Sequence, residues 1–177
     1  MIWYVLLALI LLLALFLIFV ATRPAAFRVE RSADIAAPAA TIFPLLNDFH
    51  QWAAWSPWEK LDSQMTKTFG GPPAGTGATY AWVGNKKVGE GRMTITESKP
   101  TQFLSLKLEF LKPFTATNQT TFLLSPSATG TRVVWRMDGN RNFMMKAFGL
   151  MMNMDKLVGG DFERGLANLN TIATKST

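Results

Sequence analysis

The chain has 177 residues and a formal net charge of +6, and it contains 13 Phe, 6 Trp and 9 Met but no cysteine. The missing cysteine excludes disulfides, thiolate metal sites and a cysteine nucleophile. The positive charge does not predict a nucleic-acid partner, because the basic residues are spread along the chain and no zinc spacing or RNA-binding signature accompanies them.

The first twenty residues carry no charge, no Pro and no Gly. A helix of that length spans about 30 Å, the thickness of the hydrocarbon core of a bilayer. We therefore expect residues 1–22 to form a single-pass transmembrane anchor, followed by a linker at 23–26. A cleaved signal peptide is the alternative. It is disfavoured because no Lys or Arg precedes the apolar run and no clean cleavage site follows it.

The chain after the apolar run opens with a basic flank, made by Arg23, Arg28 and Arg31. The positive-inside rule therefore places the remaining residues in the cytoplasm, next to the membrane. All charged side chains lie in this part, and its length suits one compact domain with its own core. We expect that domain to occupy residues 27–175.

The domain opens with a strand pattern at 27–35, in which Arg31 falls among the apolar positions. We expect this arginine to pair with Glu30 or Asp34 rather than to bind an anionic head group, since an unpaired interior charge is costly.

Three further kinds of element follow in chain order. Two short helices are expected between Pro38 and Trp52. Alternating apolar and polar residues then predict an antiparallel meander, with strands at 76–83, 88–97, 103–111, 114–124 and 132–138. Apolar side chains at helical spacing predict one long helix from Asn142 to Ile172. The glycine pair Gly159-Gly160 in its middle indicates a kink or a close approach to the sheet.

The order of these elements resembles the SRPBCC (START/Bet v 1-like, helix-grip) superfamily, and more closely its membrane-anchored bacterial polyketide cyclase/dehydrase and lipid-transport-like members. The matching pieces include Leu46-Asn47-Asp48-Phe49, Trp55-Ser56-Pro57-Trp58, Gly89-Glu90-Gly91 and Gly160-Asp161-Phe162-Glu163. The resemblance implies an α+β helix-grip fold, in which a curved antiparallel sheet of six or seven strands wraps around a long C-terminal helix. It also implies an internal hydrophobic cavity, but no particular reaction.

The inward strand positions and the stripe of the last helix predict the residues that line this cavity and contact a ligand. They are Tyr80, Trp82, Met93, Ile95, Leu106, Leu108, Phe110, Asn118, Thr120, Phe122, Trp135, Met151, Met154, Val158 and Phe162. Asn118 and Thr120 would either position a polar group of the ligand or satisfy one another or a buried water. The aromatic cluster Trp52, Trp55 and Trp58 is expected to pack over the end of the core.

No catalytic, cofactor-binding or metal site is expected. The charged strand residues alternate with the apolar ones and so face solvent. His50, the only histidine, has no Ser, Cys or second His at useful spacing and is expected to be solvated. Asp155 and Glu163 are expected to pair with Lys156 or Arg164 on the same helix.

The sequence thus predicts a membrane-tethered, non-catalytic binding domain for a hydrophobic or lipid-like small molecule. An enzyme of the polyketide cyclase/dehydratase kind, assisted by Tyr80, Asn118 or Thr120, is the first alternative. The second is an interaction module that acts through its surface and whose cavity is vestigial.

Overall fold

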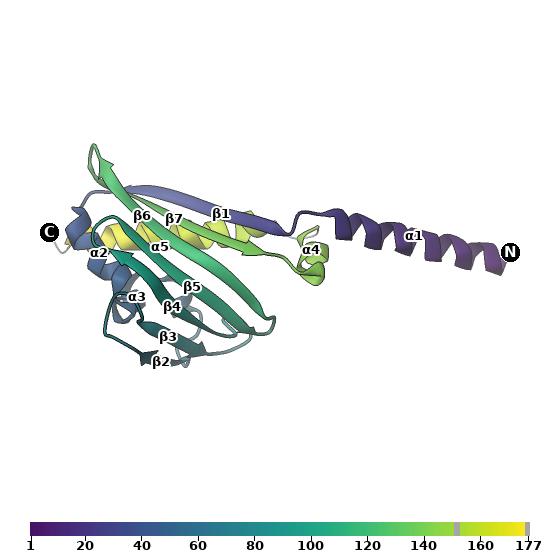
Figure 1. Ribbon diagram of the computed structural model, residues 1–177, viewed down its shortest axis with the longest axis horizontal. Helices are drawn as coiled ribbons and strands as arrows, with labels where there is room; N and C mark the ends of the chain where they lie inside the picture. Colours follow the sequence, from purple (N-terminus) through teal and green to yellow (C-terminus); the bar gives the residue numbers. More distant parts are fainter. Residues whose placement is uncertain (151–152, 176–177) are drawn as a thin grey trace.

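The computed structural model describes residues 1–150 and 153–175. It contains one sheet of seven strands, helices that cover one face of it, and an N-terminal helix that projects away from the rest (Figure 1). The strands are β1 (Ala26–Ile35), β2 (Thr66–Gly70), β3 (Thr79–Val83), β4 (Glu90–Lys99), β5 (Phe103–Lys112), β6 (Ala116–Ser127) and β7 (Gly130–Asn140).

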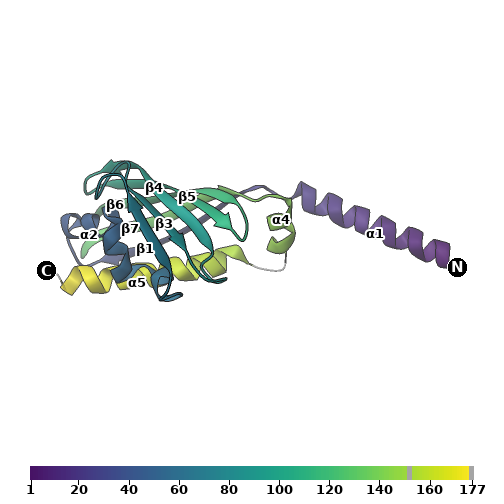
Figure 2. The same ribbon diagram turned by 90° about the horizontal axis from the view of Figure 1, so that it is seen from below.

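The sheet confirms the predicted meander. Its order is β1-β7-β6-β5-β4-β3-β2, and every neighbouring pair is antiparallel. The strand expected at 76–83 begins only at Thr79, because Gly75 and Gly77 adopt positive φ angles and turn the chain just before it. The resulting curved sheet and the long last helix form the expected α+β helix-grip fold (Figure 2).

The segment between β1 and β2 forms the expected short helices as four pieces, α2 (Ala39–Asn47), η1 (Phe49–Gln51), α3 (Trp52–Trp55) and η2 (Pro57–Lys60). Trp52 donates from Nε1 to the carbonyl of Leu46 at 2.9 Å, and Trp55 donates to the carbonyl of Leu45 at 2.9 Å. These bonds join α3 to α2 and satisfy the indole N–H groups away from water.

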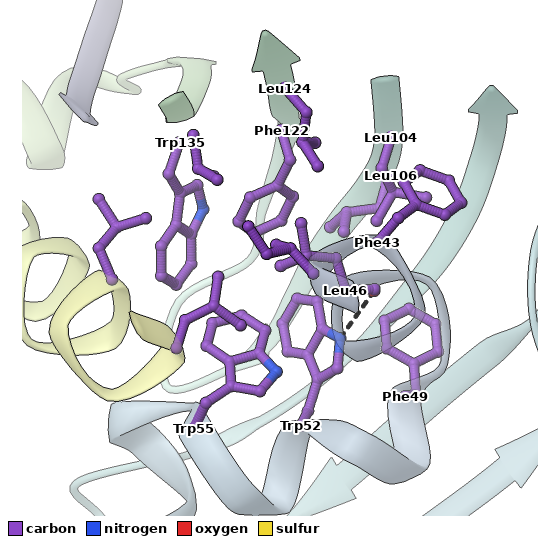
Figure 3. Close-up of a cluster of buried hydrophobic side chains, with 14 of the residues drawn as sticks. Phe43, Leu46, Phe49, Trp52, Trp55, Leu104, Leu106, Phe122, Leu124 and Trp135 are labelled. Carbon is purple, nitrogen blue, oxygen red and sulfur yellow. Dashed lines mark hydrogen bonds between the residues drawn. The ribbon is translucent and has the colours of Figure 1, made fainter. Parts of the chain in front are cut away.

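The buried core lies between these helices, the inner face of β5 to β7 and the last helix (Figure 3). Trp55 is fully buried and meets the rings of Phe122 and Trp135 edge-on, at 6.2 and 5.5 Å between centroids. The expectation that the tryptophans pack over the core is therefore confirmed for Trp52 and Trp55, whereas Trp58 is only half-buried.

The prediction of one helix from Asn142 to Ile172 is wrong. The segment forms two helices, α4 (Phe143–Gly149) and α5 (Met154–Lys175). Asn142 caps α4 by accepting a hydrogen bond from the N–H of Met145 at 2.9 Å, and Asn153 likewise accepts from Lys156 at 3.1 Å at the start of α5. The apolar stripe continues across this interruption, so periodicity alone conceals it.

The predicted close approach at the glycine pair occurs at Gly159, where a Cβ atom would collide with the guanidinium of Arg31. A second close approach lies at Gly165, whose added Cβ would come within 2.6 Å of the Trp135 ring. Both glycines let α5 lie close against the sheet.

The N-terminal helix α1 (Ile2–Thr22) is long and apolar enough to cross a membrane, with a mean hydropathy of 3.2. Val20 is its single buried residue, so α1 is not a helix of the domain core. A helix of this kind at this position is a membrane anchor or a signal sequence.

Candidate functional site

A cavity of about 250 Å³ lies between the inner face of the sheet and α5. This volume is near the lower end of the range of small-molecule pockets, about 300–1,000 Å³. Strands β3 to β7 form one wall, α5 forms the opposite wall, and α3, η2 and α4 contribute the sides.

Most of the residues predicted to contact a ligand line this cavity. These are Tyr80, Trp82, Met93, Leu106, Leu108, Phe110, Asn118, Thr120, Trp135, Val158 and Phe162. Ile95 and Phe122 lie instead in the buried core outside the cavity wall, because α2 and α3 cover that end of the sheet. Met151 lies outside the described residues, and of Met154 only the backbone is described.

The structure adds wall residues that sequence reasoning missed. Phe27, Ala116 and Met137 lie on strands, and the alternation rule would have found them. The remainder come from helices, turns and the segment before β2, where no short-range pattern points to a cavity, and include Trp52, Ser56, Trp58, Glu59, Met65, Lys87, Val88, Met145 and Asp161.

Three residues that line the cavity each carry a buried polar atom with no hydrogen-bond partner among the described residues. These atoms are Asn118 Oδ1, Thr120 Oγ1 and Trp135 Nε1. The alternative in which Asn118 and Thr120 satisfy one another is therefore wrong. A buried polar group left unpaired costs about 1–3 kcal/mol, so a buried water or a polar group of a bound molecule would stabilise these atoms.

Tyr80 and Glu59 form the polar corner of the cavity. Tyr80 donates from its hydroxyl to Glu59 Oε1 at 2.8 Å, and Lys67 contacts the other carboxylate oxygen. Burial, reinforced by the neighbouring carboxylate, raises the pKa of Tyr80 far above its ordinary value. The phenol therefore stays protonated and directs its proton at Glu59.

A flat aromatic surface forms another part of the wall. The rings of Trp135 and Phe162 stack at 4.2 Å with an interplanar angle of 6°, and Trp58 meets Phe162 edge-on at 6.2 Å. This stack joins β7 to α5, because Trp135 lies on the strand and Phe162 on the helix.

Arg31 does not form the ion pairs expected from the sequence, although its Nη1 donates to the backbone carbonyl of Glu30 at 2.8 Å. Its Nε donates to Glu163 at 2.6 Å and its Nη2 donates to Asp155 at 3.0 Å, both on α5. Glu30 and Asp34 pair instead with Arg136 and Arg132. The reason is that Arg31 faces the helix across the inner side of β1, whereas Glu30 and Asp34 point outward.

The prediction that Asp155 and Glu163 pair with Lys156 or Arg164 within α5 is also wrong. The carboxylates of Asp155 and Glu163 turn toward β1, and not toward Lys156 or Arg164. The guanidinium of Arg31 lowers the pKa of Asp155. Arg164 pairs instead with Asp161, whose side chain reaches the cavity wall.

The outward charged residues confirm the expected exterior face, since they form cross-strand ion pairs such as Arg92 with Glu109 at 2.7 Å. His50 is exposed, as expected, although its Nδ1 lies 2.8 Å from Asp48 Oδ1 and its ring stacks on Phe69 at 4.1 Å between centroids. Within the described residues, no group of three or more His, Asp or Glu side chains is placed to hold a metal ion.

The solved structures similar to this chain share its fold at low sequence identity. A structure from Thermobifida fusca is 21% identical with a TM-score of 0.64, covering 84% of this chain and 93% of that chain. A structure from Chromobacterium violaceum is 14% identical with a TM-score of 0.59, covering 85% and 98%. The di-domain aromatase/cyclase of the steffimycin biosynthetic pathway is 11% identical with a TM-score of 0.65, over 86% of this chain and 52% of that chain.

No curated protein matches the chain. The sequence pattern of the family described as polyketide cyclase / dehydrase and lipid transport, in contrast, matches residues 26–174. That range includes all seven strands, the helices α2 to α4, and nearly all of α5. With the helix-grip fold and the internal cavity, this match shows that the chain belongs to the polyketide cyclase / dehydrase and lipid transport family.

Proposed function

We propose that the domain binds a small amphipathic, lipid-like molecule in the cavity between the sheet and α5, while α1 holds it at a membrane. The observation that carries this proposal is a mostly apolar cavity whose lining residues include Asn118, Thr120 and Trp135, each with a buried polar atom that has no hydrogen-bond partner among the described residues. Apolar burial, worth about 25 cal/mol per Å², would drive entry of the ligand. The polar atoms would orient it.

The carboxylates of the cavity support binding more than proton transfer. The hydroxyl of Tyr80 and the ammonium of Lys67 both engage the carboxylate of Glu59. Asp161 is paired with Arg164. Each of these carboxylates already has a charged or hydrogen-bonded partner, so neither is poised as a free base toward the cavity.

The membrane part of the proposal is supported by α1 itself. A span of 21 residues at a rise of 1.5 Å per residue matches the hydrocarbon core, and the helix projects away from the domain (Figure 1). Retention of α1 in mature protein isolated from membranes would give an intact mass of 19.6 kDa, whereas cleavage of a signal sequence would remove the helix. Intact-mass measurement of that protein separates the two cases.

Native mass spectrometry of the full-length protein released from detergent tests the cavity. We expect bound lipid-like mass on the wild type and a strong loss of it in Leu108→Trp, because the larger side chain fills the cavity. The matched control is Leu123→Trp, which adds the same group on the opposite, partly exposed side of the sheet. Equal occupancy in both variants would refute the proposed site.

A further inference from the structure

The outer face of α4 carries exposed apolar side chains. Phe143, Met144 and Phe148 are 45%, 56% and 52% exposed. Their spacing puts all three on one side of the helix. The neighbouring residue Met145 points the other way and lines the cavity. The helix therefore separates the cavity from an apolar surface.

The apolar surface continues onto the turn between β5 and β6. Phe114 is 53% exposed and its ring centre lies 6.4 Å from that of Phe148, and Leu111, near the end of β5, is 51% exposed. We call Leu111, Phe114, Phe143, Met144 and Phe148 the apolar lip. Contiguous exposed apolar surface of this kind marks an interaction site in a folded domain.

The lip lies where the chain leaves α1. Lys146 donates from Nζ to the carbonyl of Ala21 at 3.2 Å, and Arg141 donates from its backbone N–H to the carbonyl of Ala25 at 2.8 Å. Figures 1 and 2 both show α4 beside the C-terminal end of α1 and lying across its direction. A helix crosswise to a membrane span runs along the membrane surface.

Five basic residues in this part of the domain form no ion pair with a described residue, and three of them adjoin the lip. Arg23, Arg141 and Lys146 adjoin the junction with α1, and Lys86 and Lys87 lie in the turn after β3. None of them forms an ion pair within the part of the chain that the structure describes. Basic side chains around an apolar face are attracted to anionic lipid head groups.

We propose that the apolar lip lies in the head-group region of the bilayer that α1 enters, and that its partner is an anionic lipid surface. A lipid surface fits better than a protein partner, because the lip is continuous with the end of the membrane-spanning helix. This proposal rests on the proposed function, since it requires α1 to be retained as an anchor. It places Met145, and with it one end of the cavity, at the level where a lipid ligand would leave the bilayer.

Fluorescent labelling tests this arrangement directly, because the chain has no cysteine of its own. The full-length variants Met144→Cys, Leu123→Cys and Leu9→Cys are labelled with bimane and reconstituted into vesicles of phosphatidylcholine and phosphatidylglycerol. Spin-labelled lipid then reports contact with the bilayer, and iodide reports contact with water. Leu123 lies on the outer side of the sheet and is the aqueous control, and Leu9 lies within α1.

We expect spin-labelled lipid to quench most of the emission of the labels at positions 144 and 9, and iodide to quench neither strongly. The label at position 123 should be quenched by iodide and not by spin-labelled lipid. Quenching at position 144 should deepen as phosphatidylglycerol replaces phosphatidylcholine. Lipid quenching at position 9 but not at 144 would overturn the lip and leave the anchor intact. A label at 144 that resists both quenchers would mean that a second copy of the chain covers this face. Absence of lipid quenching at both positions would refute the tether itself.

Discussion

Replacing Thr120 by Val should make the empty protein more stable and its ligand binding weaker. The hydroxyl of Thr120 is buried in the cavity wall without a hydrogen-bond partner among the described residues. An orphaned buried polar group costs about 1–3 kcal/mol, and replacing it with an apolar group of the same shape removes that cost. With the lower figure of about 1 kcal/mol, the melting temperature of a domain of this size should rise by about 2–4 °C.

The assay is thermal unfolding of the full-length protein stripped of ligand, followed by circular dichroism. The control is Thr117→Val on the exposed side of the same strand, which makes the same chemical change and the same change in β-propensity without removing a buried orphan. We expect a rise in melting temperature for Thr120→Val that clearly exceeds that of the control. A fall for Thr120→Val would refute the reasoning, because it would show that the hydroxyl is satisfied in the folded protein.

A hydrogen bond of about 1 kcal/mol to Asn118 should make the wild type bind 1-naphthol about fivefold more tightly than naphthalene. Asn118→Leu should abolish this difference in affinity, measured by titration calorimetry after subtracting the heat of ligand uptake by protein-free bilayers. Gly159→Ala should lower the free energy of unfolding in urea by about 1 kcal/mol relative to Gly160→Ala, because both variants gain the helix propensity of alanine but only the Cβ at position 159 displaces Arg31 from Asp155 and Glu163. Gly160→Ala is its control and should not destabilise, since its Cβ has 3.7 Å to its nearest neighbour, Arg164. Hydrogen bonds from Arg92 lower the pKa of Glu109 to about 2. The pairing therefore stabilises the fold fully at pH values above the ordinary glutamate pKa of about 4.3, and this stabilisation is lost as the pH falls toward 2. Glu109→Gln should therefore cost less than about 1 kcal/mol at neutral pH, and nothing below pH 2, in urea titrations at several pH values; an equal cost at both extremes would contradict this assignment.

Most strands of the meander were predictable because one face of each is buried and the other is exposed, and the alternation of apolar and polar residues reflects this. Strand β2 has no buried face, since all of its residues are exposed, and so no alternation of apolar and polar residues shows where it begins and ends. The break between α4 and α5 was hidden for a different reason. The apolar stripe runs through both α4 and α5, so only the capping residues Asn142 and Asn153 indicate that there are two helices.

The cavity was predictable as a face but not as a volume. Strand parity tells which side of the sheet a residue occupies, and so it selected Leu108 and Asn118 correctly as inward residues. It does not tell where along the strand the cavity ends, and Phe122 lies beyond that point under α3. Glu59 could not be assigned at all, because only the tertiary position of η2 brings its carboxylate to Tyr80.

The break after α4 also determines how the cavity relates to the membrane. If residues 142–172 formed one straight helix, α4 would extend beyond the sheet along the direction of α5, and Met145 would leave the cavity wall. The break instead turns α4 across the end of α1, where Met145 lines the cavity while Lys146 bonds to the carbonyl of Ala21. Two neighbouring side chains of one short helix thus connect the ligand space and the proposed anchor. A movement of α4 relative to α1 would therefore change the cavity wall, so under both proposals α4 would couple the position of the anchor to the shape of the cavity.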